Sequence, residues 1–493
     1  MSIFSSEVFL AVLGIALVLV SVFFPKIPTR TLAWIGIAGV LASLACLLGA
    51  SAAETSLPAF VAPYYSLDSH SLFYKGFALV ITALVLWLIT ESEKTLVNYS
   101  LDGQIGELVG LPLIVCTGMM WIASARDLIT VFTALELVTV SFYVLVAYTR
   151  KSALSLEAGV KYLILGAAAT GVLVYGIAWI YGATGSLTFE GISASLRDPS
   201  TGKGTLLFGI VLLLAGLGFK VAAAPFHMWV PDVYQGAPAP VTAFLSVGSK
   251  ASGFIILTRL VDSLVISSTL VSVEVINLLL ISAAITMILG SLPAIFQTSV
   301  KRLLAYSSIS HAGFLLLALA CRGSTRFDLA AGDVVAFYLG TYLPMTVLAF
   351  FVLCVARRHG RGDSLEDLRG LARSSPLLAL LMTVAMASLA GLPLTVGFLG
   401  KMMVLMAGVD RGYWGVVGCA VLSAAAGFYY YFRVILTLYS GDNSQTSEPI
   451  QLSLLSRVIA ILLAAAVIIT GIYPRPLQRA ISGAPAAALT TQR

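Results

Sequence analysis

Two stretches of the sequence decide the fold. Residues 216–225 read GLGFKVAAAP and residues 391–401 read GLPLTVGFLGK, so each places a lysine, Lys220 or Lys401, in an apolar run that also contains a proline. Proline removes a backbone N–H and interrupts a helix. A charge in an apolar segment faces a polar interior rather than lipid. These stretches therefore predict interrupted membrane helices, which are typical of ion-binding transporters.

The composition places the whole chain in lipid. Of 493 residues, 59% are hydrophobic and only 11% are charged, far from the composition of soluble domains. The formal net charge is +6, but the basic residues lie in the breaks between apolar blocks. Membrane topology explains this distribution, and we expect no nucleic-acid partner.

The apolar blocks have the length of membrane helices, for which about 20 residues are needed. We predict an all-α integral membrane protein, a single polytopic domain over residues 1–493 with about 14 transmembrane helices. The predicted spans cover residues 7–24, 31–50, 70–91, 105–124, 126–148, 158–182, 204–224, 241–262, 271–296, 302–321, 330–356, 376–407, 412–440 and 452–474.

The basic breaks predict the orientation of the chain. The densest breaks follow the first, fifth, ninth and eleventh spans, and therefore share one side of the membrane. Basic loops stay in the cytoplasm, so we expect a multi-pass protein of the bacterial inner membrane with both termini in the periplasm. These breaks contain Lys26 and Arg30, Arg150 and Lys151, Lys301 and Arg302, and Arg357, Arg358, Arg361, Arg369 and Arg373.

The two lysine-bearing interrupted spans are the seventh and the twelfth, five helices apart. A repeat of five helices is odd, so its second copy must enter the membrane upside down. We therefore predict two inverted-topology repeats, with spans 4 to 8 over residues 105–262 and spans 9 to 13 over residues 271–440.

Four charges lie deepest in apolar sequence: Glu136 in FTALELVTV, Lys220, Lys250 in SVGSKASGF, and Lys401. A charge at this depth costs at least about 2.5–3.5 kcal/mol on insertion scales, so such residues are functional candidates. Glu136 stays ionised there only beside a cation such as Lys220. This pair is either a static link between helices or a switchable proton-loading site.

Lys250 and Lys401 have no acidic residue within a turn on their own spans, which makes each a candidate for proton exchange along a water chain. Snorkelling to the interface is the competing interpretation. His311, in YSSISHAGF, titrates in a range that suits a proton relay, although a hydrogen-bonded core histidine fits the same sequence.

The sequence predicts no cofactor or metal in this chain. The five cysteines are scattered singly in apolar stretches, and the four histidines show no ligand spacing. The Gly400-Lys401 pair is followed by Met402 rather than by the Ser or Thr of a nucleotide-binding loop. We therefore expect any redox cofactor to belong to a partner.

Several longer segments carry a family resemblance. Residues 219–254, FKVAAAPFHMWVPDVYQGAPAPVTAFLSVGSKASGF, and residues 300–314, VKRLLAYSSISHAGF, strongly resemble the subunit N family of proton-pumping NADH-quinone oxidoreductases. EAGVKYLILGA from Glu157 and GLPLTVGFLGKMM from Gly391 are similar to the same family. The related subunits L and M and the multisubunit sodium/proton antiporters share PFH-x-W-x-PD, but the continuation DVYQGAPAPVTAF resembles subunit N most.

The resemblance assigns roles to the buried charges. It implies Glu136 as the acid of the fifth span, Lys220 as its partner, Lys250 as the central lysine and Lys401 as the lysine of the distal half-channel. On this interpretation protons load Lys220 from the cytoplasm, pass Lys250 and waters with His311 as a further relay group, and leave from Lys401 to the periplasm. The same groups could also work with the Lys401 end as the entry.

The resemblance also implies partners. The expected function is proton translocation in a complex whose other subunits transfer electrons from NADH to quinone, using FMN and iron-sulfur clusters that this chain lacks. The antiporter-like subunit M, small membrane subunits and the lipid bilayer would surround it. Three alternatives stay open: an autonomous cation/proton antiporter, the equivalent subunit of a membrane hydrogenase, and a scaffold whose buried charges only specify packing.

Overall fold

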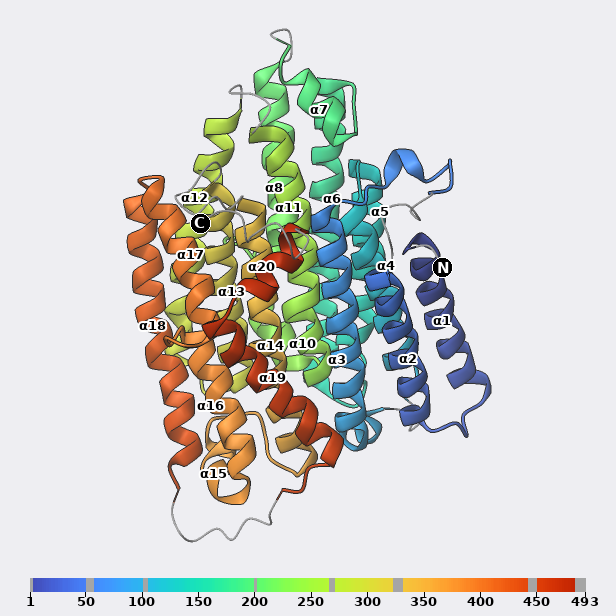
Figure 1. Ribbon diagram of the computed structural model, residues 1–493, viewed down its shortest axis with the longest axis vertical. Helices are drawn as coiled ribbons and strands as arrows, with labels where there is room; N and C mark the ends of the chain where they lie inside the picture. The colour runs from blue at the N-terminus through green and yellow to red at the C-terminus, as the bar shows by residue number, and fades with distance from the viewer. Residues whose placement is uncertain are drawn as a thin grey trace. The chain divides into compact units, whose positions relative to one another are not determined.

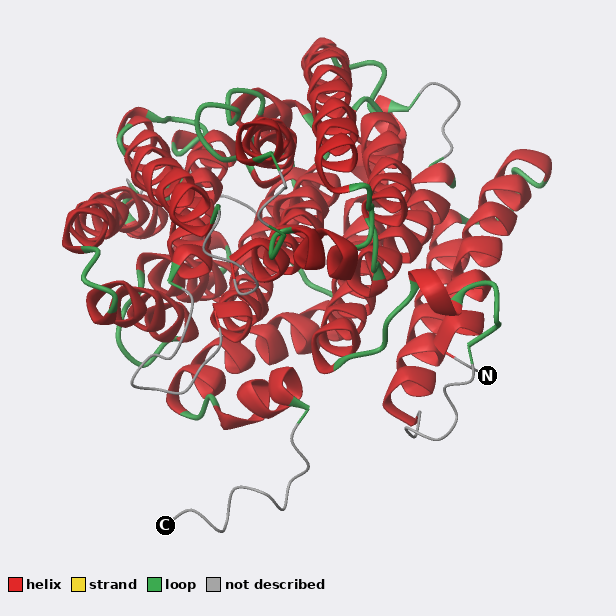
Figure 2. Cartoon of the chain, turned by 90° about the horizontal axis from the view of Figure 1, so that it is seen from above, coloured by secondary structure: helices red, strands yellow, loops and turns green. Residues whose placement is uncertain are grey.

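The computed structural model describes residues 3–49, 57–100, 105–198, 202–265, 271–321, 331–441 and 450–483. These residues form helices joined by loops and no strand (Figure 2). Thirteen of the described helices are long and apolar enough to cross a membrane. The predicted all-α membrane fold is confirmed.

The chain divides into two compact units, Met1–Thr286 and Met287–Arg493. The described helices of the first unit are α1 (Ile3–Phe23), α2 (Thr29–Gly49), η1 (Ala62–Tyr64), α3 (Ser69–Tyr99), α4 (Glu107–Ser124), α5 (Leu128–Val146), α6 (Ala153–Thr184), α7 (Phe189–Ser195), α8 (Lys203–Val221), α9 (Val230–Gly236), α10 (Ala239–Phe244), η2 (Leu245–Ser249), α11 (Lys250–Val265) and α12 (Ser272–Ser291), the last of which continues past the boundary.

The second unit contains the two halves of the other interrupted span. Its described helices are η3 (Pro293–Phe296), α13 (Val300–Ala320), α14 (Ala331–Arg358), η4 (Glu366–Leu368), α15 (Leu371–Ser374), α16 (Pro376–Ala390), α17 (Val396–Asp410), α18 (Trp414–Tyr439), α19 (Leu454–Ile472) and α20 (Arg475–Ser482).

The predicted span 376–407 is two helices of 15 residues each, α16 and α17. Each half is about 22 Å long at 1.5 Å per residue, too short to cross about 30 Å of hydrocarbon alone. The thirteen candidate helices therefore do not include this predicted span, the twelfth. The predicted span 204–224 likewise stops early, at Val221.

Small residues bring the first four helices close together (Figure 1). A β-carbon added to Gly14 of α1 would lie 2.9 Å from the Gly110 carbonyl oxygen of α4, and one added to Gly110 would lie 2.5 Å from the Gly14 oxygen. Such contacts are typical of helix packing in membranes, where close backbone approach replaces the hydrophobic effect.

Acidic caps position the starts of two helices in the first unit. Asp127 accepts hydrogen bonds from the Ile129 and Thr130 amides at 2.9 Å each, which starts α5. Asp68 forms a capping box with Ser71 at the start of α3. These carboxylates satisfy amides that have no partner within their helix.

Candidate functional site

The first break follows Lys220. α8 ends because Ala222 adopts a left-handed conformation with φ of 64°. The Phe219 carbonyl oxygen near this helix end accepts a hydrogen bond from the Trp229 indole at 3.0 Å. A free helix end in lipid would be costly, so this aromatic donor helps to hold the irregular segment that separates α8 from α9.

Lys220 and Glu136 meet inside the first unit. The Lys220 Nζ lies 3.8 Å from the Glu136 Oε1, beyond hydrogen-bonding distance. Each group has a hydroxyl partner instead: Lys220 donates to Thr139 at 2.7 Å, and Thr170 donates to Glu136 at 2.9 Å. The two charges therefore attract one another while each keeps a separate hydrogen bond, so small side-chain movements change their separation.

The burial of this pair is unequal. The Lys220 side chain is 2% exposed, whereas that of Glu136 is 26% exposed. On α6, Lys161 forms ion pairs with Glu157 and Asp232 at 2.7 Å each. Because Asp232 belongs to α9, this pair joins α6 to the helix that follows the break.

Lys250 is the first residue of α11, which packs against α8, the helix of Lys220. It is 3% exposed and directly follows the π-helical residues of η2, a distortion that often occurs at functional sites. One turn later, a β-carbon added to Gly253 would lie 2.5 Å from the Val221 Cγ1 and 3.6 Å from the Lys220 Cβ. The absence of a side chain at Gly253 thus lets α11 approach α8.

The second break holds Lys401. Gly391 ends α16 with φ of 92°, and Leu394 has φ of 69° before α17 begins. The Lys401 Nζ donates to the Leu389 and Ala390 carbonyl oxygens at 2.8 and 3.0 Å. These oxygens lie at the last turn of α16, where carbonyls lack helical partners and the helix dipole is negative, so the helix end stabilises the ammonium.

The Lys401 side chain is directed into the protein. Lys401 is 8% exposed, and its Nζ lies 5.6 Å from the centre of the Phe314 ring. This placement argues against snorkelling to an interface. Within the described residues, the two non-glycine residues with a left-handed φ are Ala222 and Leu394, one in each break. Strained backbone of this kind clusters at functional sites.

His311 lies in a polar network of the second unit. It is 3% exposed, with Nδ1 2.6 Å from the Tyr338 hydroxyl and Nε2 3.3 Å from the Tyr431 hydroxyl. Tyr431 in turn hydrogen-bonds Ser307. Both ring nitrogens therefore have hydroxyl partners that can pass a proton.

This network also borders the helix of Lys401. The Tyr338 ring stacks with Phe314 at a centroid distance of 6.4 Å, and Phe314 lies under the Lys401 ammonium. A β-carbon added to Gly400, the residue before Lys401, would lie 3.2 Å from Tyr338. The rings of Tyr338 and Phe314 therefore lie between His311 and Lys401.

The sequence did not reveal the hydroxyl partners. Thr139, Thr170, Tyr338 and Tyr431 are ordinary in membrane helices, and each meets its charged or titratable partner from a different helix. Only the tertiary packing identifies them. In the described residues, no three His, Cys, Asp or Glu side chains are placed to hold a metal ion.

The comparisons with known proteins fit this geometry. The family described as NADH:quinone oxidoreductase/Mrp antiporter, TM, matches residues 125–428. The NADH-quinone oxidoreductase subunit N of Trichlorobacter lovleyi is 39% identical over 471 residues, which cover 95% of this chain and 93% of the relative.

Two solved structures are similar over almost the whole chain. A chain of respiratory complex I from Thermus thermophilus with bound aureothin has a TM-score of 0.79 and 31% identity, with coverage of 97% of this chain and 100% of that chain. A chain of the membrane-bound sulfane sulfur reductase, an archaeal respiratory membrane complex, has a TM-score of 0.79 and 25% identity, with coverage of 96% of both.

The broken apolar helices and their buried lysines, together with the family match, define an antiporter-like membrane protein. The sequence identity to curated relatives narrows the assignment from this class to one family. The chain belongs to the subunit N family of NADH-quinone oxidoreductases.

Proposed function

We propose that this chain translocates protons as a membrane subunit of NADH-quinone oxidoreductase, in which other subunits transfer electrons from NADH to quinone. The observation that carries the proposal is the placement of three buried lysines, Lys220, Lys250 and Lys401, at or beside distorted helices. Buried ionisable groups at interrupted helices are typical of ion pathways. The names of the curated relatives support the host complex.

Lys220 would be the loading group of the first unit. When Glu136 moves toward it, the carboxylate stabilises the ammonium and a proton is held. When Glu136 moves toward Thr170, burial favours the neutral amine and the proton leaves. The present geometry, with a 3.8 Å separation and separate threonine partners, lies between these two arrangements.

Lys250, His311 and Lys401 would carry the proton onward. Lys250 lies one turn before the glycine contact with α8, which suits exchange with Lys220 through water. Lys401, held by the carbonyls at the end of α16, would be the group of the distal half-channel, with His311 as a relay. We propose entry from the cytoplasm at Lys220 and release toward the periplasm at Lys401.

The remaining features of the proposal concern the surroundings. The chain would hold no redox cofactor and perform no chemistry of its own, while FMN, iron-sulfur clusters and quinone belong to partners. It would lie in the bacterial inner membrane with both termini in the periplasm, next to the antiporter-like subunit M and small membrane subunits. The curated names and the complex I likeness support the partner class.

The test replaces Lys220 by methionine, which keeps the length of the side chain and removes the charge. In membranes that contain the whole complex, we expect loss of proton translocation and of coupled quinone reduction, with unchanged NADH oxidation by an artificial acceptor. The acceptor reaction reports assembly of the redox subunits. Undiminished proton translocation by this variant would refute the proposal.

A second measurement separates a complex I subunit from an autonomous antiporter. The purified chain in liposomes is exposed to an imposed sodium gradient, and internal pH is followed with a dye. We expect no sodium-dependent proton exchange, because the proposed driving force comes from quinone reduction elsewhere. Sodium-driven exchange by the isolated chain would favour the antiporter.

A further inference from the structure

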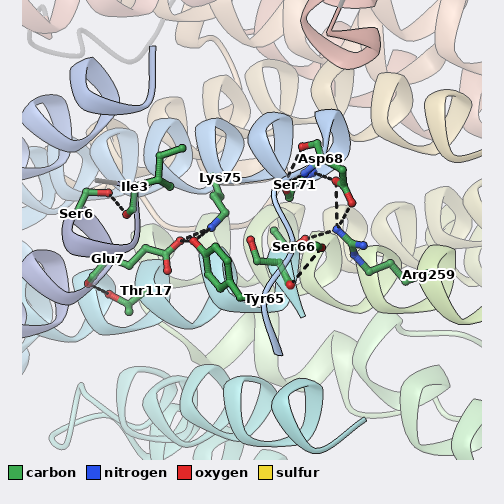
Figure 3. Close-up of polar contacts among 12 residues, drawn as sticks. Ile3, Ser6, Glu7, Tyr65, Ser66, Asp68, Ser71, Lys75, Thr117 and Arg259 are labelled. Atoms are coloured by element: carbon green, nitrogen blue, oxygen red, sulfur yellow. Dashed lines mark hydrogen bonds and ion pairs between the residues drawn. The ribbon is translucent and has the colours of Figure 1, made fainter. Parts of the chain in front are cut away.

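A second group of buried charges lies outside the residues discussed so far, among α1, α3 and α4 (Figure 3). Lys75 donates hydrogen bonds to the Glu7 Oε1 and to the Tyr65 hydroxyl. The Tyr65 hydroxyl donates to the same Glu7 Oε1 at 2.7 Å. We call Glu7, Lys75 and Tyr65 the N-terminal triad. All three lie before residue 125, where the matched family region begins.

The N-terminal triad is sealed from its surroundings. The side chains of Glu7 and Lys75 are 0% exposed, and Tyr65 is 6% exposed. On α4, Thr117 donates to the backbone carbonyl of Glu7 at 3.4 Å, and the thiol of Cys116 interacts electrostatically with the Glu7 carboxylate. A buried ion pair is costly to form and is weak evidence for stability.

The carboxylate of Glu7 is incompletely paired. Both donors of the triad converge on Oε1, whereas Oε2 is buried without a hydrogen bond of normal geometry among the described residues; the Trp121 indole also interacts with this carboxylate. Leaving a buried charged acceptor without a full set of hydrogen bonds is unfavourable.

Electrostatic interactions link the triad to the start of α3 and to the helix of Lys250. Three residues after Tyr65, Asp68 caps α3 and accepts hydrogen bonds from Arg259 at 3.0 and 3.3 Å. Lys75 interacts electrostatically with Asp68 and Arg259. Arg259 belongs to α11, whose first residue is Lys250, about 13 Å away along the helix at 1.5 Å per residue.

Asp68 gives this connection an exposed end. Its side chain is 45% exposed and that of Arg259 is 20% exposed. Burial raises the pKa of Asp68, but the Arg259 guanidinium and the Ser71 amide outweigh it, so the net pKa lies below its usual value. Asp68 is therefore a half-exposed carboxylate at the start of α3, whereas the side chains of the N-terminal triad are buried. His70 also interacts with this carboxylate.

We propose that the N-terminal triad is an additional proton-exchange site, which trades a proton with the surface that Asp68 faces and is coupled through Arg259 to the helix of Lys250. The proton moves from the Lys75 ammonium to the Glu7 carboxylate, which leaves a neutral amine and a carboxylic acid. Transient opening toward Asp68 then admits a hydronium ion, which protonates the amine and leaves as water. Release reverses these two steps, so charge and protons balance.

This inference rests on the proposed function, because an exchange site matters only if the chain translocates protons. Its competitor is a static ion pair that fixes α1 against α3. The two interpretations differ in what a neutral pair does. A static pair is replaceable by an uncharged pair of similar size, whereas a proton-exchange site is not.

The experiment compares three variants in membranes that contain the whole complex. They are Glu7→Gln with Lys75→Met together, Tyr65→Phe alone, and the control Glu190→Gln. Glu190 belongs to an exposed pair with Arg126 on the same unit, with side chains 79% and 37% exposed. Proton translocation, coupled quinone reduction and artificial-acceptor oxidation are measured for each.

We expect the double variant to lose about a hundredfold or more in proton translocation, because a positioned proton-transfer group contributes about 10²–10⁴-fold. Its artificial-acceptor oxidation and the control should match the unmodified complex. Tyr65→Phe removes one hydroxyl and keeps the ion pair. The complex with this variant should therefore assemble normally but translocate protons more slowly. If the double variant or, where that variant fails to assemble, Tyr65→Phe translocates at the unmodified rate, the triad is a packing element.

The Lys220→Met variant separates failure of this inference from failure of the proposed function. If Lys220→Met stops translocation but the triad variants do not, only the additional site is disproved. If Lys220→Met has no effect, the proposed function itself fails, whatever the triad variants do.

Discussion

The ion pair of the first unit permits the most quantitative prediction. Replacing Glu136 by glutamine removes the charge that faces Lys220 but keeps an oxygen that can accept the Thr170 hydrogen bond, now 2.9 Å long. The local geometry should therefore survive. The change isolates the electrostatic effect of the carboxylate on the lysine.

The magnitude follows from the separation. At 3.8 Å, two unit charges interact by about 4 kcal/mol at an effective dielectric constant of about 20. The Glu136 side chain is 26% exposed, and screening by water reduces this to about 2 kcal/mol. Since about 1.4 kcal/mol is a factor of ten, the protonated form of Lys220 should become about thirtyfold less favoured.

We expect proton translocation by Glu136→Gln to fall by about this factor if loading of Lys220 limits the rate. Translocation is followed with a pH-sensitive dye in membranes containing the complex, with artificial-acceptor oxidation as the measure of redox-subunit assembly and the amount of this chain in the purified complex as the measure of its own. The matched control is Glu190→Gln, the same chemical change at an exposed pair. Translocation equal to that of the unmodified complex would show that the carboxylate does not control the lysine.

Three further predictions concern the second unit. Lys401→Met should abolish translocation while Lys401→Arg retains part of it, because only arginine can still donate to the carbonyls at the end of α16; equal activity of both variants would contradict this. Tyr338→Phe removes the 2.6 Å partner of His311 and should slow translocation with a stability loss of about 1 kcal/mol in thermal unfolding. Gly397→Ala places a methyl carbon 1.9 Å from the Ser388 carbonyl oxygen, so it should lower the melting temperature of the complex; an unchanged value would disprove the close packing of α16 on α17.

The interrupted spans were predictable because their signal is local. A proline and a lysine within one apolar run conflict with a regular lipid-facing helix. The breaks after Lys220 and before Lys401 accordingly appear in the structure. Their exact positions were not predictable, because the left-handed residues Ala222 and Leu394 depend on how neighbouring helices hold the chain.

The N-terminal triad shows the opposite case. Glu7 and Lys75 lie within six residues of the starts of their predicted spans, where charged residues ordinarily reach the interface. No local pattern marks them as buried. Their fully buried side chains follow from the packing of α1 against α4 and of α3 against α4, together with the loop that carries Tyr65.

The sequence by itself determined that this chain lies in a membrane, which helices are interrupted and which ionisable residues are unusual, because the cost of placing charge or proline in an apolar helix depends on a residue and its near neighbours. Only the tertiary structure decided which groups face one another. Thr139 beside Lys220, the α16 carbonyls around Lys401 and the pairing of Glu7 with Lys75 all join different helices. Electrostatic and hydrogen-bond energies fall off over a few ångströms, so contacts between distant segments decide them.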